Sequence, residues 1–397
     1  MWYRGNPSFC TPPSASTRDN AMEDIIDHVL PDLLVVNEMD GNNSISPARL
    51  QLNALNQNGR AYYTSAKRSG SGSLINMLYY NKEKFVLESQ TDISKDLSNS
   101  NLVRVIDIYT LRYIDTNLSI HKDTTRINII AAHLKAGNSS NDETERGEAT
   151  EAVMAYLDSN NLDGNFLFAG DLNLYKSTEP AYQDLISYVD TNFRFFDPVN
   201  TAGTWSNRSV YASLHTQSTR SSSSGCFVGG GMDDRFDFIL ASDEIMNNID
   251  KVEYISNTYK ALGQDGKRFN GSVNSPANTS EPSAVITALN NMSDHLPVIM
   301  DLKITLPLAT SIAENKGIPK LHFVNPTTGI LRINLGRNDL KINKIEVLNI
   351  AGQQMKEIAV SGSNWIEEDI SNLPNGTYLI RVTYESFQQS IEKLIKI

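Results

Sequence analysis

Cysteine is scarce in this sequence, and its scarcity excludes two classes of protein. Only Cys10 and Cys226 occur among 397 residues. Two thiols cannot provide the ligand spacing of a zinc cluster, nor the set of several disulfides that holds together small secreted domains. On their number alone, these cysteines are equally compatible with one disulfide in an exported protein and with two unpaired thiols.

Positive charge is also in short supply. The chain has 35 Lys and Arg against 46 Asp and Glu, a formal charge of −11, which argues against a broad electrostatic grip on nucleic acid. A nucleic-acid substrate is not excluded, because acidic metal ligands add negative charge and the bound metal reverses the local field. Residues 321–397 contain 8 basic and 8 acidic residues, so the whole excess precedes them. This asymmetry predicts two separate units.

Long apolar runs and several familiar motifs are missing. No apolar stretch approaches the roughly 18 residues that span a bilayer, so we expect no stable membrane insertion. The opening residues lack the basic region and apolar run of a signal peptide. The sequence contains no GxSxG nucleophile elbow, no HExxH zinc motif and no P-loop, which excludes the hydrolase classes built on them.

Helical and strand-like patterns alternate through the first three quarters of the chain. EDIIDHVL predicts an amphipathic helix that Pro31 stops, and LLVVN predicts a short buried strand after it. RINIIAAHL, NFLFAGDLN, RFDFIL and LPVIMDLKI predict further strands, with helices between them. The pattern indicates an α/β domain over residues 1–305. A segment rich in Ser and Gly, residues 216–234, is expected to be a mobile loop.

The remainder of the chain has a different texture. Residues 306–320 contain two prolines and no clear period, and we interpret them as a linker. Residues 321–397 consist of short strand-like runs separated by turn signals such as Asn325-Pro326 and Asn375-Gly376. This spacing predicts a small all-β sandwich.

Polar residues close several of the predicted strands of the α/β domain. In α/β folds the ligand crevice forms at strand ends, where distant parts of the sequence converge. Each residue alone has a plain explanation, such as a solvated acid, a turn or a cap. Asp237 is harder to dismiss, because a carboxylate inside an apolar strand needs a partner. The candidate site residues at these ends are Glu38, His133, Asp171, Asn173, Asp237, Asp294 and His295.

These motifs occur in a recognisable order. PDLLVVNE, AAHLKAG, GDLN, RFDFIL and SDHLPV follow one another between residues 18 and 304. In that order they resemble the endonuclease/exonuclease/phosphatase superfamily, which includes DNase I-like nucleases, abasic-site endonucleases, sphingomyelinases and inositol-polyphosphate phosphatases. The resemblance implies a DNase I-like four-layer α/β sandwich.

The resemblance also implies a metal site. Glu38 corresponds to the primary magnesium ligand and Asp294 to a second carboxylate on the metal side. Hard oxygen ligands suit Mg²⁺ or Mn²⁺, with waters completing the octahedron. Arg104, within the strand-like run LVRVIDIYTL, is a further candidate for a phosphate contact; the alternative is a surface charge on a strand.

The catalytic roles are likewise implied by the resemblance. Asp171 orients or deprotonates the attacking water, and Asn173 holds a phosphate oxygen. His295 lies beside the phosphate, with Asp237 holding its ring and stabilising its charged form. His133 donates to a phosphate oxygen or to the leaving group. Which residue is base and which is acid stays open.

The front of the sequence departs from this pattern. The family begins with a strand that carries an Asn near the metal site, whereas this chain opens with WYRGNPSFC, in which Asn6 is a poor substitute. We therefore expect that the first strand is missing. If the protein is exported, we predict that Cys10 and Cys226 form a disulfide that holds two loops near the site.

The C-terminal module resembles the sorting domain of Bacteroidetes type IX secretion, on VNPTTGILRINL, IEVLNIAGQQM, DISNLPNGTYLIRV and the terminal KLIKI. A generic β-sandwich is the alternative. A carbohydrate-binding module is weakened because Trp365 is the module's only tryptophan. The resemblance implies that the type IX machinery is a partner, that the protein is secreted or displayed on the cell surface, and that a signal peptide lies upstream.

Together these features favour a secreted, monomeric, metal-dependent phosphodiesterase that acts on nucleic acid. A phosphatase or sphingomyelinase shares the same chemistry, and the core motifs do not separate them. A catalytically inactive binding protein on this fold is the alternative from another class. It would require the loss of a site residue, and none of the seven is missing.

Overall fold

The computed structural model of the chain describes residues 13–42, 46–70, 72–118, 122–306, 322–334, 341–360, 365–384 and 389–397. The chain divides into two compact units, Met1–Leu308 and Ala309–Ile397. The predicted linker, apart from Leu306, lies outside the described residues, as do Asn6 and Cys10. No helix in the described part of the chain is long and apolar enough to cross a membrane.

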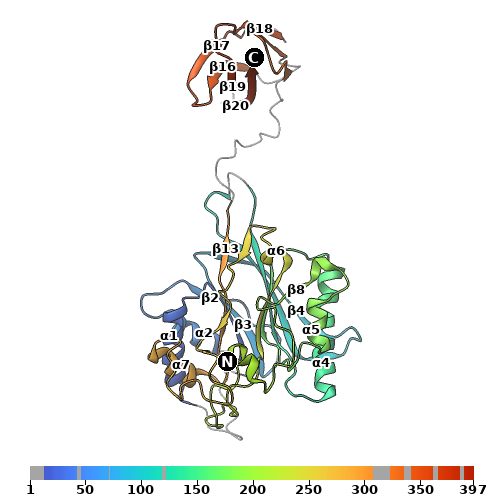
Figure 1. Ribbon diagram of the computed structural model, residues 1–397, viewed down its shortest axis with the longest axis vertical. Helices are drawn as coiled ribbons and strands as arrows, with labels where there is room; N and C mark the ends of the chain where they lie inside the picture. The colour runs from blue at the N-terminus through green and yellow to red at the C-terminus, as the bar shows by residue number, and fades with distance from the viewer. Residues whose placement is uncertain are drawn as a thin grey trace. The chain divides into compact units, whose positions relative to one another are not determined.

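A six-stranded sheet forms the centre of the first unit (Figure 1). Its neighbouring strands pair antiparallel except for β6 and β7, which are parallel. Both of these strands are apolar and almost wholly buried, as expected of strands covered on two faces. The strand order is β4 (Phe85–Lys95), β5 (Asn101–Tyr113), β6 (Arg126–His133), β7 (Phe166–Asp171), β9 (Asp237–Ser242), β8 (Phe195–Phe196).

Helices α4 (Ser140–Ser159) and α5 (Pro180–Ile186) cover one face of this sheet. Alternation along the strands explains this layer, because Phe168 and Ile130 point toward the helices whereas Leu167 and Ile129 point the other way. A capping box between Ser139 and Asp142 starts α4.

A second, divided sheet packs on the opposite face. Its larger part has the order β1 (Leu33–Asp40), β3 (Leu74–Asn81), β2 (Tyr63–Ser65). Two short pairs complete it, β10 (Val252–Tyr254) with β13 (Leu302–Ile304) and β11 (Lys260–Ala261) with β12 (Val298–Ile299).

The helices α1 (Ala15–Val29) and α7 (Ser283–Met292) cover the outer side of the second sheet and share an apolar core with β1 and β3. Figure 1 shows α1 and α7 on one side of the unit and α4 and α5 on the other. The four layers, helices–sheet–sheet–helices, confirm the predicted α/β architecture. Short elements lie in the connections: α2 (Ser46–Leu50), η1 (Gln51–Leu55), η2 (Thr191–Phe193), η3 (Ser209–Leu214) and α6 (Asp243–Met246).

Two predicted strands differ from expectation. Asp237 is the first residue of β9 rather than an interior one, because the backbone of Phe236 pairs instead with Leu172 and with the hydroxyl of Thr216. The run LPVIMDLKI is split into β12 and β13, since the N–H of Asp301 donates to the Thr258 hydroxyl. The segment predicted to be a mobile loop contributes to the interior, since Thr219 and Met232 within it are fully buried.

The second unit is a small all-β sandwich, as predicted. A three-stranded sheet and a four-stranded sheet enclose an apolar core that includes Ile333, Val347 and Ile380. The first sheet has the order β14 (His322–Phe323), β15 (Ile330–Asn334), β18 (Trp365–Asp369). The second has the order β17 (Gln354–Ile358), β16 (Ile342–Asn349), β19 (Gly376–Tyr384), β20 (Gln389–Lys396).

Candidate functional site

Three strand ends bring predicted site residues side by side. His133 ends β6 and Asp171 ends β7, and these two residues are register partners in the parallel pair. Asp237 begins β9 directly opposite Asp171 in the neighbouring antiparallel pair. Because adjacent strands lie about 4.8 Å apart, the sheet places the three side chains in one row where these strands end or begin.

Burial shapes the charges of His133 and Asp171. Nε2 of His133 lies 3.4 Å from Oδ2 of Asp171. Burial, reinforced by the positive charge of Arg104, lowers the pKa of His133 well below its usual value, so the ring is neutral. Burial also raises the pKa of Asp171 to about 7, although the charge of His295 opposes the shift. Asp171 is therefore a carboxyl that titrates near neutral pH.

His295 completes the row through Asp237. Nδ1 of His295 lies 2.7 Å from Oδ2 of Asp237, within hydrogen-bond distance as the sequence predicts. Burial alone would lower the pKa of His295, but the charge of Asp237 and this hydrogen bond raise it well above its usual value. The ring is therefore charged. The side-chain amide of Gln217 lies 2.7 Å from its Nε2, and because a charged ring donates from Nε2, the amide must present its oxygen to it.

The predicted phosphate contacts meet at one carbonyl. Nδ2 of Asn173 donates to the carbonyl of Leu134 at 3.2 Å, and Nη1 of Arg104 donates to the same oxygen at 2.5 Å. Burial lowers the pKa of Arg104, while the charges of Asp171 and Glu38 oppose that shift. The guanidinium is therefore half-buried near the charges of Asp171 and Glu38, and its contact with a phosphate stays a prediction.

Among the described residues, Glu38 has fewer hydrogen-bond partners than the other site carboxylates. It lies at an irregularity in the pairing of β1 with β3, with φ 56°. In the described part of the chain its carboxylate makes no hydrogen bond or ion pair, whereas Oδ2 of Asp294 accepts from the backbone N–H of Val228 at 2.9 Å. The buried guanidinium of Arg18 interacts with the charges of both carboxylates.

Glu38 and Asp294 offer the carboxylate oxygens that a magnesium ion prefers as ligands. The described residues contain no group of three or more His, Cys, Asp and Glu side chains arranged around a metal position. Mg²⁺ does not need such a group, because it keeps several waters and binds through one or two carboxylates. The carboxylate of Glu38 and the second oxygen of Asp294 would hold it.

Asn37 was not predicted, yet it joins the two sheets at the site. Its Oδ1 accepts from the N–H of Asp171 at 3.2 Å, and its Nδ2 donates to the carbonyl of Ala132 at 3.0 Å and to Asn76 at 2.8 Å. The sequence signal was an amide within the apolar run LLVVN. Gln217 was also missed, and a Ser-rich segment offers no local signal for its role.

A buried ion pair ties the loops behind the site. Nη2 of Arg146 lies 2.5 Å from Oε2 of Glu179, and both side chains are fully buried. Arg146 also donates to the carbonyls of Lys135 and Gly137, while Oε1 of Glu179 accepts from the N–H of Tyr175. The pair therefore fixes the segments that follow His133 and Asp171.

The predicted pairing of Cys10 with Cys226 stays a prediction. Cys226 lies in the segment that borders the site, two residues before Val228, whose N–H contacts Asp294. Cys10 lies outside the described residues.

Residues 323–397 match the family described as "Secretion system C-terminal sorting domain". No curated protein matches the chain. Among similar solved structures, the human Nocturnin catalytic domain with bound sulfate has 16% identity over 74% of this chain and 88% of that chain, with a TM-score of 0.46. D. rerio TDP2 complexed with a single-strand DNA product has 13% identity over 72% of this chain and 92% of that chain, with a TM-score of 0.44.

An endonuclease/exonuclease/phosphatase family protein from Bacteroides thetaiotaomicron has 12% identity over 75% of this chain and 92% of that chain, with a TM-score of 0.45. The chain thus carries a secretion system C-terminal sorting domain, and the solved structures similar to it include endonuclease/exonuclease/phosphatase family proteins.

Proposed function

We propose that the first unit hydrolyses phosphodiesters with Mg²⁺ or Mn²⁺ and that nucleic acid is its substrate. The row from His133 through Asp171 and Asp237 to His295 carries the proposal. It combines a neutral histidine, a carboxyl that titrates near pH 7 and a charged histidine. Perturbed groups of this kind are typical of active sites.

The row can supply the proton transfers of the reaction. Hydrolysis needs an aligned water, neutralisation of the non-bridging oxygens and stabilisation of the leaving oxygen. The metal, when bound, neutralises phosphate charge. Asp171, with a pKa of about 7, can accept a proton from the water. His295 keeps its charge through Asp237 and faces a phosphate oxygen through Nε2, in place of its contact with Gln217. His133 orients Asp171 from the next strand.

An activity panel tests the proposal. Supercoiled plasmid, single-stranded RNA, sphingomyelin and an inositol polyphosphate are each incubated with the full chain, with Mg²⁺ and with EDTA. We expect Mg²⁺-dependent cleavage of nucleic acid. The Asp171→Asn variant should lose about 100-fold or more in turnover, as general bases typically contribute. Glu151→Gln, on the exposed side of α4, should keep full activity.

The panel also separates the alternatives. If the protein turns over only sphingomyelin or only the inositol polyphosphate, that compound replaces nucleic acid as the proposed substrate. Turnover that persists in EDTA would remove the metal from the proposal. Binding without turnover of any substrate, in a folded protein, would favour the inactive binding protein.

We propose further that the sorting domain directs export through type IX secretion to the cell surface or medium. The match of residues 323–397 supports this role. Deletion of residues 307–397 should abolish export in a host with that system and leave specific activity unchanged. A chimera with an unrelated small β-domain in place of residues 323–397 is the control and should also stay inside. Export of either variant would contradict the proposal.

A further inference from the structure

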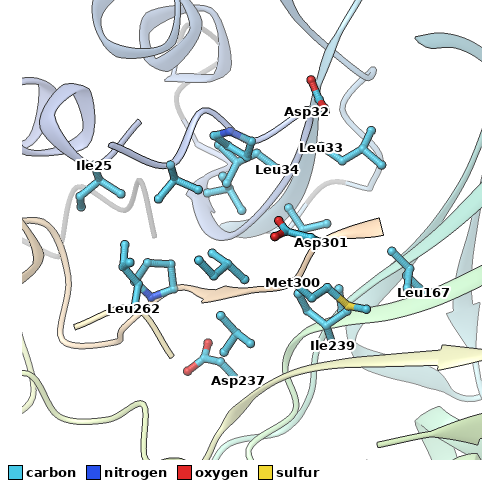
Figure 2. A pocket seen from close by; sticks show the side chains of 18 of the residues that line it. Ile25, Asp32, Leu33, Leu34, Leu167, Asp237, Ile239, Leu262, Met300 and Asp301 are labelled. Carbon is cyan, nitrogen blue, oxygen red and sulfur yellow. The ribbon is translucent and has the colours of Figure 1, made fainter. Parts of the chain in front are cut away.

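A chain of polar side chains crosses the space between the two sheets and ends at Asp171. Most side chains in this space are apolar, as Leu167 and Ile239 are (Figure 2). Asp107 of β5 and Asn76 of β3 lie among them and are almost fully buried. Buried polar groups are nearly always hydrogen-bonded, so the partners of these two side chains indicate what they do.

Asn76 can take only one orientation in this chain. Its Nδ2 lies 2.9 Å from the carbonyl of Val105, 3.1 Å from the carbonyl of Ala131 and 3.3 Å from Oδ2 of Asp107. Two carbonyls and a carboxylate are acceptors, so the amino end of the amide has to face them. The oxygen of Asn76 is thereby turned toward Asn37.

The orientation of Asn37 follows from that of Asn76. Nδ2 of Asn37 donates to Oδ1 of Asn76 at 2.8 Å and to the carbonyl of Ala132 at 3.0 Å. These two bonds use both hydrogens of the amino group, and Oδ1 on the other side accepts from the N–H of Asp171 at 3.2 Å. Turning either amide by half a rotation would bring two donors or two acceptors together.

The backbone next to Asp171 is shaped for this contact. Gly170 has φ 141°, a conformation that residues with a Cβ atom rarely adopt. A Cβ atom there would collide with the carbonyl oxygen of Ala132 and would lie 3.0 Å from Oδ1 of Asn37. A glycine at this position therefore lets the amide of Asn37 reach the end of β7.

We propose that Asn76 is a positioning residue for the reaction of the first unit and that it acts on Asp171 through Asn37. The inference rests on the proposed function, in which Asp171 accepts the proton of the water. A fixed N–H of Asp171 keeps its carboxyl group in place, 3.4 Å from Nε2 of His133. Asp107 supports Asn76 from the other end of the chain of side chains. Misplacing a catalytic group by about 1 Å can cost roughly 100-fold in rate.

Asn165 offers a matched comparison at the other end of the same strands. It directly precedes β7 and is similarly buried, and its Nδ2 also donates to two carbonyls and one carboxylate, those of Arg126 and Asp250. Its Oδ1 makes no hydrogen bond within the described part of the chain. Asn76→Ala and Asn165→Ala should therefore lower stability by similar amounts, whereas only the first should affect Asp171.

Two measurements on the full chain test the inference. Hydrogen exchange of the Asp171 amide is followed by NMR in EDTA and without substrate, so this measurement does not depend on phosphoesterase activity. We expect this amide to exchange about tenfold faster or more in Asn76→Ala than in Asn165→Ala, because it loses a fixed acceptor. With nucleic acid and saturating Mn²⁺, kcat should fall about 10- to 100-fold in Asn76→Ala alone, with KM almost unchanged.

A double-mutant cycle separates positioning from a general loss of stability. If Asn76 acts through Asn37, then Asn76→Ala should lower kcat no further in a protein that already carries Asn37→Ala, whereas independent effects would add. Additive losses would overturn the inference, as would equal exchange at Asp171 in the Asn76 and Asn165 variants. A loss seen only at limiting Mn²⁺ would place the effect on Glu38 and would also overturn it.

If Asn76→Ala does not fold, Asn37→Ala provides the test. It removes the acceptor of the Asp171 N–H directly, at a half-buried position. Exchange at Asp171 should rise by about tenfold or more, and unchanged exchange would overturn the inference. A folded protein without phosphoesterase activity would refute the proposed function and with it the catalytic role, while the exchange data would still show whether Asn76 holds the end of β7.

Discussion

Oδ2 of Asp237 lies 2.7 Å from Nδ1 of His295, although the two residues are 58 positions apart. The contact joins the first residue of β9 to the segment that follows α7. It gives a charged imidazole a fixed direction at the edge of the central sheet, next to Asp171.

Asp237→Asn should weaken catalysis by shifting the titration of His295. Without the neighbouring negative charge the pKa of His295 falls, so a smaller fraction of the ring is charged at any given pH. The alkaline limb of the pH–rate profile should move to lower pH, and kcat should fall roughly 10- to 100-fold, as for other residues that orient a catalytic group. Asp243→Asn, in α6, is the control and should leave the profile unchanged. An unmoved alkaline limb in Asp237→Asn would contradict this role.

Glu38→Gln should remove most turnover while the fold persists. The amide keeps the size of the side chain but lacks the negative charge that a hard divalent cation needs. Mn²⁺ binding, measured by calorimetry, should weaken by at least about tenfold in the same variant. Asp24→Asn, on the exposed side of α1, is the control. Unchanged Mn²⁺ affinity in Glu38→Gln would rule Glu38 out as a ligand.

Glu179→Gln should be strongly destabilising. It leaves the guanidinium of Arg146 buried without a full negative charge, and breaking a buried ion pair costs about 3–5 kcal/mol. The midpoint of urea unfolding, followed by tryptophan fluorescence, reports the loss. Glu143→Gln removes a partner of Lys176 in a more exposed pair and should cost no more than about 1 kcal/mol. Equal effects of the two substitutions would show that the buried pair contributes no more to stability than the exposed pair.

Asp107→Asn should change how stability depends on pH. Burial raises the pKa of Asp107 to about 6, against the hydrogen bonds from Ser69 and Asn76. The folded state therefore favours the protonated carboxyl. This preference adds fully to the free energy of unfolding below about pH 4, and the added stability is lost as pH rises through 6. Two pKa units correspond to roughly 3 kcal/mol.

The free energy of unfolding of Asp107→Asn, relative to the original protein, should accordingly increase between pH 4 and pH 7. Asp24→Asn is the control, since Asp24 is exposed on α1 and is not among the groups that shift the pKa of Asp107, so it should give a nearly constant difference. A flat difference for Asp107→Asn as well would mean that Asp107 does not titrate in this range.

Local patterns were sufficient to predict much of the fold. The strand ends at His133 and Asp171 were recognised because an apolar β-branched run followed by polar residues reflects burial along one short segment. The separate all-β unit was recognised for the same reason, since its turns and alternating runs are local signals. The start of β9 was missed because Phe236 leaves the ladder for a partner in a distant loop.

By itself the sequence determined the order of the elements, the two units and the residues that close the strands, because burial and chain reversal leave their mark on neighbouring residues. Only the tertiary structure decided that Asn37 links the sheets and that Gln217 reaches His295. These features depend on pairing between distant segments, and a hydrogen bond across the fold leaves no periodic pattern in the residues on either side of it.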